Sequence, residues 1–203
     1  MPDAVRTIRH PDAPIEELLL GRWSPRAMSG EPIADAELAR LFEAARWAPS
    51  SGNSQPWRYV YGRRGTPAFD VLFGLLTEGN RRWAGQGALL AVVLAVDVDP
   101  RNGKVLRTNA YDAGAAWENL ALQGCAMGLV VHGMQGFDYD RARSELQVPD
   151  GVSVLAMFAI GRPGASAALP EDLQKREVPS QRNPVATFAF EGIYPAAAPS
   201  ATT

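Results

Sequence analysis

The sequence has 203 residues, a length that suits one domain of generous size. Hydrophobic residues make up 46% of it and charged residues 21%, and 20 basic residues stand against 22 acidic ones. This balance gives no electrostatic reason to expect a nucleic-acid or membrane-surface partner. We expect a single domain over residues 1–203, with flexible ends at residues 1–13 and 195–203.

Cysteine usage and hydropathy indicate the compartment. Cys125 is the single cysteine and lies in an apolar run, where a small buried hydrophobic residue is the expected role. Residues 1–20 contain no apolar stretch of the kind found in secretory signals. The longest apolar run, Gly87 to Val96, is shorter than the roughly 20 residues that a membrane span needs. A reducing, cytoplasmic setting is expected.

In chain order, the first half predicts two helices and a strand. A short helix is expected over residues 14–20, followed by a turn-rich segment over residues 24–32. Asp35 is expected to cap a second helix, which Pro49 ends. Aromatic residues alternate with others over residues 57–61, which predicts a strand. The apolar face of the second helix is Leu38, Leu41, Phe42 and Ala45.

The second half alternates helices with strands. Thr66-Pro67 opens a helix in the usual N-cap and first-turn positions, and the aliphatic run over residues 88–96 predicts a strand buried on both sides. The inner face of that helix is expected to be Leu72, Phe73 and Leu76. The later elements are a helix over residues 108–127, a strand over 129–132, a helix over 138–147 and a strand over 152–160.

Two features predict an oligomer. The helix over residues 108–127 is apolar or small on nearly every side, so it needs more cover than one chain of this size supplies. Its alanine-rich side is expected to pack against a copy of itself across a two-fold axis. The last ~40 residues, from Gly161 on, show little regular pattern, and such tails are commonly functional. Their apolar anchors, which suggest docking, are Val178, Val185, Phe188, Phe190 and Tyr194.

The chain offers few side chains for demanding chemistry. It contains no phosphate-binding Walker loop, no zinc-protease motif and no serine-hydrolase elbow. Gly85 to Leu90 partly matches a dinucleotide loop, but it precedes a strand instead of following one. With two histidines, His10 in the N-terminal arm and His132 in an expected structural role, we predict no metal site and no catalytic side chain. Reactivity would then come from an organic cofactor.

Arg22, Ser24 and Arg26 form the first candidate binding element. They are spaced two residues apart, which places all three side chains on one side of an extended segment. Forked guanidinium donors match phosphate oxygens well, so this segment can serve as a phosphate clamp. A solvated basic edge is the alternative interpretation.

The stretch from Pro49 to Trp57 is the second candidate. A helix ends at a proline, six consecutive polar or glycine residues follow, and a second proline leads into an aromatic strand. Closely spaced hydroxyls and amides can satisfy a polyhydroxylated chain or the edge of a heteroaromatic ring. An ordinary capped loop is equally compatible with these residues.

Together, these two segments resemble the nitroreductase family. Three later stretches agree: Gly79 to Trp83, the segment from Gly128 to Asp138 after the alanine-rich helix, and Gly161-Arg162-Pro163 followed by Arg182-Asn183-Pro184. The resemblance spans about residues 15–192, and the loop ending in Gln-Pro-Trp is its most specific part. It implies an α+β fold with a central, mostly antiparallel sheet flanked by helices. It also implies a C-terminal extension that wraps the partner subunit.

The resemblance also implies an FMN site at the interface of a homodimer. Arg22, Ser24, Arg26 and Arg182 match contacts to the phosphate and ribityl chain. Pro49, Ser50, Ser51 and Asn53 match a loop that reaches the flavin from the other subunit, with Gln55 as a possible addition. Asn80 matches a polar contact to the ribityl chain or the pyrimidine edge, and the backbone N–H groups of Gln135 and Gly136 match positions near flavin N5.

This sequence departs from the family pattern at two positions. Trp83 stands where members often carry a lysine or arginine near the pyrimidine end of the flavin, and Arg81 or Arg82 could replace it only with a backbone shift. Loss of that cation would lower the reduction potential of the flavin. Gln135 stands where many members have glutamate, which matters little if only the backbone N–H is used.

The expected activity is ping-pong hydride transfer from NADH or NADPH through flavin N5 to a small electron-poor acceptor. A nitroaromatic, a quinone or an enone would fit. Trp23, Trp83 and Phe137 are candidate walls of the pocket, although core packing explains each equally well. Two alternatives stay open: a specialised relative, such as a dehalogenase, an azoline oxidase or a semialdehyde reductase, and a non-catalytic flavin-binding dimer.

Overall fold

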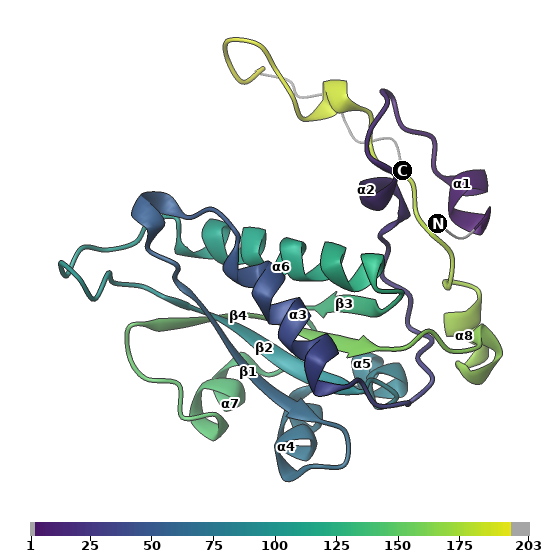
Figure 1. The fold of residues 1–203 in the computed structure, drawn as a ribbon, viewed down its shortest axis with the longest axis horizontal. Coiled ribbons are helices and arrows are strands. Elements are labelled where there is room, and N and C mark those ends of the chain that lie inside the picture. The colour runs from purple at the N-terminus through teal and green to yellow at the C-terminus, as the bar shows by residue number, and fades with distance from the viewer. Residues whose placement is uncertain (1–2, 196–203) are drawn as a thin grey trace.

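The structure is a computed structural model that describes residues 3–195 (Figure 1). Of the ends expected to be flexible, 1–13 and 195–203, residues 1–2 and 196–203 therefore lie outside the described residues. The first half contains α1 (Asp3–Ile8), α2 (Glu17–Gly21), α3 (Asp35–Arg46), η1 (Ser51–Asn53), β1 (Trp57–Arg63), α4 (Pro67–Leu75), α5 (Glu78–Ala84) and β2 (Leu89–Val96). The second half contains α6 (Asn109–Ala126), β3 (Val130–Met134), α7 (Tyr139–Glu145), β4 (Val152–Gly161), η2 (Ser166–Ala168), α8 (Glu171–Gln174) and η3 (Val185–Thr187).

A four-stranded sheet in the order β1-β2-β4-β3 forms the centre, and each neighbouring pair is antiparallel. Helices α3 and α6 cover one face, and α4, α5 and α7 lie on the other (Figure 1). The predicted α+β fold with an antiparallel sheet is confirmed. The predicted wrapping of a partner by the C-terminal extension stays a prediction.

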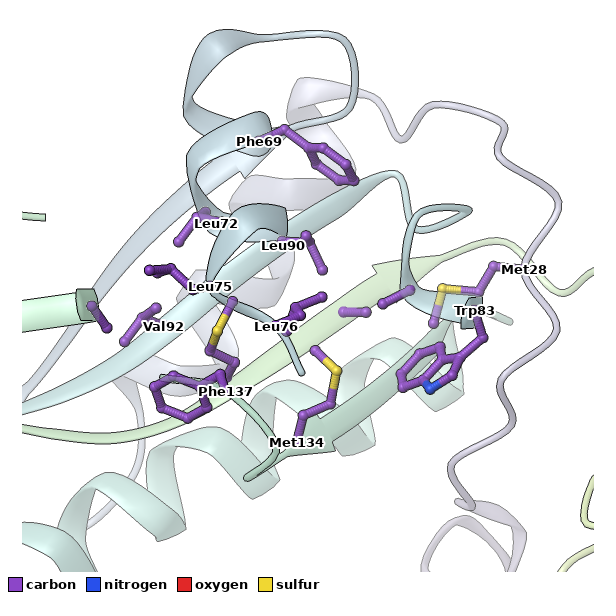
Figure 2. Close-up of a cluster of buried hydrophobic side chains, with 14 of the residues drawn as sticks. Met28, Phe69, Leu72, Leu75, Leu76, Trp83, Leu90, Val92, Met134 and Phe137 are labelled. Carbon is purple, nitrogen blue, oxygen red and sulfur yellow. The ribbon is translucent and has the colours of Figure 1, made fainter. Parts of the chain in front are cut away.

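Strand β2 shows why the sequence folds in this way. Its residues Leu89 to Ala95 are all buried, and successive side chains point to opposite faces of the sheet. Leu90, Val92 and Leu94 therefore join the core under α4 (Figure 2), and the residues between them join the core under α3 and α6. A strand with two apolar faces needs helices on both sides, as predicted from its unbroken apolar run.

Each predicted helix is present, with ends that differ from the prediction by up to three residues. The Thr66 hydroxyl accepts the Phe69 N–H at 3.3 Å, which confirms the predicted cap of α4. Asp35 does not cap α3: it is the first helical residue, and the Glu37 carboxylate accepts the Ala34 N–H at 2.8 Å instead. Helices α1, α5 and α8 are not among the predicted elements; the exposed, charged residues of α5, for example, show no apolar periodicity.

Helix α6 is partly covered within the single chain. Its inner face is fully buried, with Ala113, Ala116 and Leu120 at 0% exposure. An outer stripe of Tyr111, Gly114, Ala115, Glu118, Leu122 and Cys125 is exposed or half-buried, and Tyr111 is 80% exposed. The helix thus needs cover on one side and not on all sides, because α3, β2 and β3 already cover the rest. Among the described helices, none is long and apolar enough to cross a membrane.

The described N-terminal and C-terminal segments lie together, outside the layers around the sheet (Figure 1). The N-terminal arm with α1 and α2 lies beside the segment that follows α8 (Figure 1). The described part of the arm is packed: Val5 is buried, and the guanidinium of Arg9 donates to the carbonyls of Leu20 and Ser180. Further along, the tail anchors Val178, Val185, Phe188 and Tyr194 are exposed.

Candidate functional site

The predicted phosphate clamp forms one wall of a cavity. A space of about 300 Å³ lies between the segment after α2 and the segment after α8. It is lined by Arg9, Arg22, Trp23, Ser24, Arg26, His132, Arg176, Val178, Ser180 and Arg182. Five of these residues are arginines and none is acidic, so the cavity is suited to a multiply charged anion. The structure thus brings Arg22, Ser24, Arg26 and Arg182 together.

The extended backbone after α2 explains this arrangement. Arg22 leaves the helix with φ −70° and ψ 120°, so side chains two residues apart point the same way. The Arg22 guanidinium donates to the Ser24 hydroxyl at 3.3 Å and pairs with Glu118 of α6 at 3.3 Å. These contacts hold Arg22 at the cavity wall without placing a carboxylate in the lining.

Arg9 is a cavity residue that the sequence analysis missed. Its side chain is buried, and one guanidinium nitrogen, Nη1, donates to the carbonyls of Leu20 and Arg22, each at 2.7 Å. Burial, with the charges of Arg182 and Arg22, lowers the pKa of Arg9. The arm was expected to be flexible because no local pattern indicates contacts with residues 11 to 171 positions away.

His132 supports the clamp from behind. Its Nδ1 lies 2.9 Å from the Pro25 carbonyl oxygen, and its ring packs on Trp83 with 4.4 Å between centroids. Burial lowers the pKa of His132 to about 4, helped by the charges of Arg26 and Arg22. The imidazole is therefore neutral at pH 7, and Nδ1–H can donate to Pro25. The predicted structural role fits this geometry.

This histidine predicts a dependence of stability on pH in the cofactor-free protein. The unfolded chain binds a proton near pH 6.5, whereas the folded chain binds it only near pH 4, so acid favours unfolding between these values. His132 should lower the free energy of unfolding by about 2 kcal/mol from pH 7 to pH 5. Urea titrations at both pH values, with His132→Gln as the comparison, measure this. An equal loss in the variant would contradict it.

Asn80 and Gly136 form a second group of predicted residues. The Asn80 side-chain amide donates to the Gly136 carbonyl at 3.0 Å, and the Thr77 N–H donates to the same oxygen at 2.9 Å. A Cβ on Gly136 would lie 2.7 Å from Asn80 Nδ2, so this close approach requires glycine. Within residues 3–195, no protein acceptor receives the backbone N–H of Gln135 or Gly136. Both donors are available to a ligand.

The packing around Trp83 explains why an apolar residue stands where the family pattern often has a lysine or arginine. Trp83 is buried against His132 and belongs to the core under α4 (Figure 2), so a charged residue at this position would be desolvated. Arg82 pairs with Asp172 at 2.5 Å, and Arg81 donates to the Gly74 carbonyl at 2.6 Å. Both arginines are thus engaged by residues of the same chain. Phe137 is buried in the same core, whereas Trp23 does line the arginine cavity.

The polar loop over residues 49–56 is held by hydrogen bonds and lies apart from the clamp. The Ser51 N–H donates at 3.1 Å to the buried carboxylate of Asp112, and Arg101 donates to the Gly52 carbonyl at 3.1 Å. Within the loop, the Ser50 hydroxyl accepts the Gln55 N–H at 3.0 Å. Asn53 and Gln55 have φ of 53° and 48°, so the chain turns sharply here.

The candidate site is therefore divided in two within one chain. The polar loop lies beside the first turn of α6, and Figure 1 shows it as the blue turn between α3 and β1. It contains the predicted residues Pro49, Ser50, Ser51 and Asn53. Helix α2, which is followed directly by the clamp residues from Arg22 on, lies at the opposite end of α6 (Figure 1). One chain thus carries both predicted elements, but it does not bring them together.

Comparisons with known proteins agree with this architecture. Residues 19–65, which contain both predicted binding segments, match the family described as the nitroreductase family. A crystal structure of an oxidoreductase containing FMN is 42% identical with a TM-score of 0.88, and the match covers 92% of this chain and 96% of that one. This chain belongs to the nitroreductase family. The family and the oxidoreductase class predicted from the sequence are confirmed.

Two curated relatives show the range within this nitroreductase family. A 5,6-dimethylbenzimidazole synthase of Rhodospirillum rubrum is 29% identical over 183 residues, which cover 77% of this chain and 85% of that protein. An NADH dehydrogenase of Thermus thermophilus is 26% identical over 181 residues, covering 71% and 84%. Family membership therefore leaves the reaction to be argued from the site.

Proposed function

We propose that this nitroreductase-family chain is an FMN-dependent oxidoreductase that passes hydride from NADH or NADPH to a small electron-poor acceptor. The observation that carries the proposal is the cavity of about 300 Å³ lined by five arginines and no acidic residue. Its volume suits the charged tail of FMN and not the whole coenzyme. The rest of the coenzyme would lie outside the cavity.

The residues present fit this cofactor. Arg22, Arg26 and Arg182 would hold the phosphate, with the Ser24 hydroxyl toward the ribityl chain. The free N–H groups of Gln135 and Gly136 would face the flavin near N5, where donors stabilise added electron density. Bound FMN supplies the redox chemistry that these side chains lack. Asn80, whose amide already donates to Gly136, would position that turn and offer its oxygen to the ligand.

The polar loop would complete this site from a second copy of the chain. Its residues, Pro49, Ser50, Ser51, Asn53 and Gln55, lie far from the clamp of their own protomer, so they could meet only the clamp of another one (Figure 1). The exposed stripe of α6 and the exposed tail anchors, such as Phe188 at 66% exposure, support a homodimer in which both are covered. Such a dimer would have two equivalent sites.

The chain needs no acid or base for this reaction. The half-buried His132 is neutral and already lies against the Pro25 carbonyl, and no other histidine or cysteine lines the cavity among the described residues. Reductant and acceptor would use one pocket in turn, so hydride is delivered and removed in separate half-reactions. A cytoplasmic setting, where NADH and NADPH are available, stays a prediction.

A visible spectrum tests the proposal. Purified protein, reconstituted with FMN if necessary, should show the two flavin absorption bands. NADPH or NADH should bleach them under argon, and a nitroaromatic or a quinone should restore them. Protein that stays colourless after incubation with excess FMN would refute the proposal. Tight FMN binding without reduction by either nucleotide would instead favour a non-catalytic flavin-binding dimer.

A specialised reaction is the second candidate, because the synthase of Rhodospirillum rubrum is among the relatives and Trp83 replaces the usual cation. Without that cation, reduced flavin is less stabilised and is therefore a stronger reductant, which favours a reaction on acceptors that are harder to reduce. Steady-state rates with a panel of nitroaromatics, quinones, enones and dehalogenation substrates distinguish a general reductase from a specialised enzyme. A turnover number for one special substrate that exceeds all quinones by about 100-fold would favour the specialised reaction.

A further inference from the structure

We propose that Glu177 is a positioning residue for the phosphate site. In this proposal its buried carboxylate fixes the backbone at Arg26, so that the Arg26 guanidinium is held at the cavity before any ligand arrives. The nature of the ligand rests on the proposed function, whereas the tether is a property of the fold. Glu177 lies in the segment after α8, 151 residues from Arg26.

Two short hydrogen bonds form the tether. One carboxylate oxygen of Glu177, Oε1, accepts the backbone N–H groups of Arg26 and Ala27, each at 2.7 Å. The side chain of Glu177 is only 4% exposed. Hydrogen bonds to a charged acceptor are stronger than neutral ones, and burial protects these from water. This carboxylate therefore joins the C-terminal segment directly to the clamp.

The Glu177 side chain points away from the cavity, so its negative charge does not face the space where an anion would bind. Arg176 and Val178 line the cavity, but Glu177 between them does not. Its second oxygen, Oε2, lies 3.9 Å from Arg26 Nη1 and makes no hydrogen bond within the described residues. Glu177 thus places its negative charge behind Arg26, where it can restrain the arginine without competing for an anion in front.

The position of the tether within the clamp is the reason for its effect. His132 fixes Pro25 through its carbonyl, and Met28 forms an isolated bridge with Pro163. Arg26 and Ala27 lie between these two anchors, and Glu177 holds their N–H groups. Removal of the carboxylate would free the backbone at Arg26, and a ligand would then have to order it. Pre-organised arginines bind phosphate more tightly because this ordering cost is absent.

Binding of FMN and of riboflavin separates positioning from a general loss of structure, because riboflavin lacks the phosphate. Glu177→Ala should weaken FMN binding by about 10-fold to 100-fold, while riboflavin affinity changes by less than about 2-fold. Glu177→Gln keeps an oxygen that can accept both N–H groups, so it should recover most of the lost affinity. Glu171→Ala, an exposed glutamate of α8, is the matched control and should bind both ligands as the wild type does. Equal losses for FMN and riboflavin, or no loss for either, would overturn the proposal.

Hydrogen exchange in the FMN-free protein tests the tether without the cofactor. The Arg26 and Ala27 amides should be protected in the wild type and in Glu177→Gln, and should exchange at least about 10-fold faster in Glu177→Ala. Rapid exchange in the wild type would refute the tether even if FMN binds tightly. Protected amides in a protein that does not bind FMN would instead refute the proposed function and leave the tether supported.

Discussion

Phe158→Ala should lower the free energy of unfolding by about 3–5 kcal/mol, a large part of the roughly 5–15 kcal/mol typical of a domain. Phe158 is 0% exposed on the central strand β4, between Ala91 of β2 and Gly133 of β3. Its ring meets Tyr59 edge-on, with 6.0 Å between centroids. Truncation would remove this contact and leave a cavity under α3 and α6, in the centre of a sheet that cannot collapse around it.

Urea unfolding at one fixed protein concentration measures this effect, since subunit association would make the midpoint depend on concentration. Phe158→Leu is the matched control. It keeps most of the apolar volume and should cost roughly 1 kcal/mol. Equal losses for the two variants would show that the site tolerates a cavity, and the assignment of Phe158 to a tightly packed core would be wrong.

The sheet could be predicted because its strands carry their own signal. The unbroken apolar run that forms β2 has no polar face, and β4 is apolar except for Ser153, so burial between two layers of helices is the expected arrangement. Thr66-Pro67 likewise predicted the start of α4 from local chemistry alone. In each case the decisive interactions involve neighbours in the sequence or the overall apolarity of a segment.

The errors arose where distant contacts decide the structure. Helix α5 has no apolar periodicity, and its first turn is held by Thr77 and Asn80, which donate to the Gly136 carbonyl more than 50 residues away. At α3, Asp35 alone was predicted as the cap, but the helix begins at Asp35 and the Glu37 carboxylate accepts the Ala34 N–H instead. The apolar count of α6 predicted burial on every side, but sequence alone did not show how much the same chain would cover.

The residues of the candidate site likewise fall into those with a local sequence signal and those without one. Regular spacing made Arg22, Ser24 and Arg26 visible, and the structure brings them together with Arg182. Arg9 and Glu177 carry no local signal, because each acts through backbone groups in another part of the chain. A search for arginines and buried carboxylates near the predicted clamp could have suggested both residues as candidates, but not which contacts they form.

Arg22→Ala combined with Arg26→Ala should weaken FMN binding by at least about 100-fold, because each arginine–phosphate pair contributes roughly 1.5–3 kcal/mol. Both guanidinium groups line the arginine cavity, and each has a carboxylate partner outside its lining. Arg40→Ala, an exposed arginine of α3, is the control and should bind FMN normally. Fluorescence titration with FMN gives the dissociation constants. Unchanged affinity in the double variant would place the phosphate elsewhere.

The same double variant can show whether the polar loop comes from the partner. Ser51 is exposed, so Ser51→Trp should fold normally yet block the site that the loop enters. Each variant alone should bind little FMN. In a heterodimer, the intact clamp of one chain would meet the intact loop of the other, so a randomly mixed population should regain about one quarter of the wild-type FMN content. Differently tagged chains isolate the heterodimer, which should hold about one FMN per dimer. A heterodimer without FMN would mean that clamp and loop of the same chain form the site, and the division seen across α6 would then have to close by a large movement within one protomer.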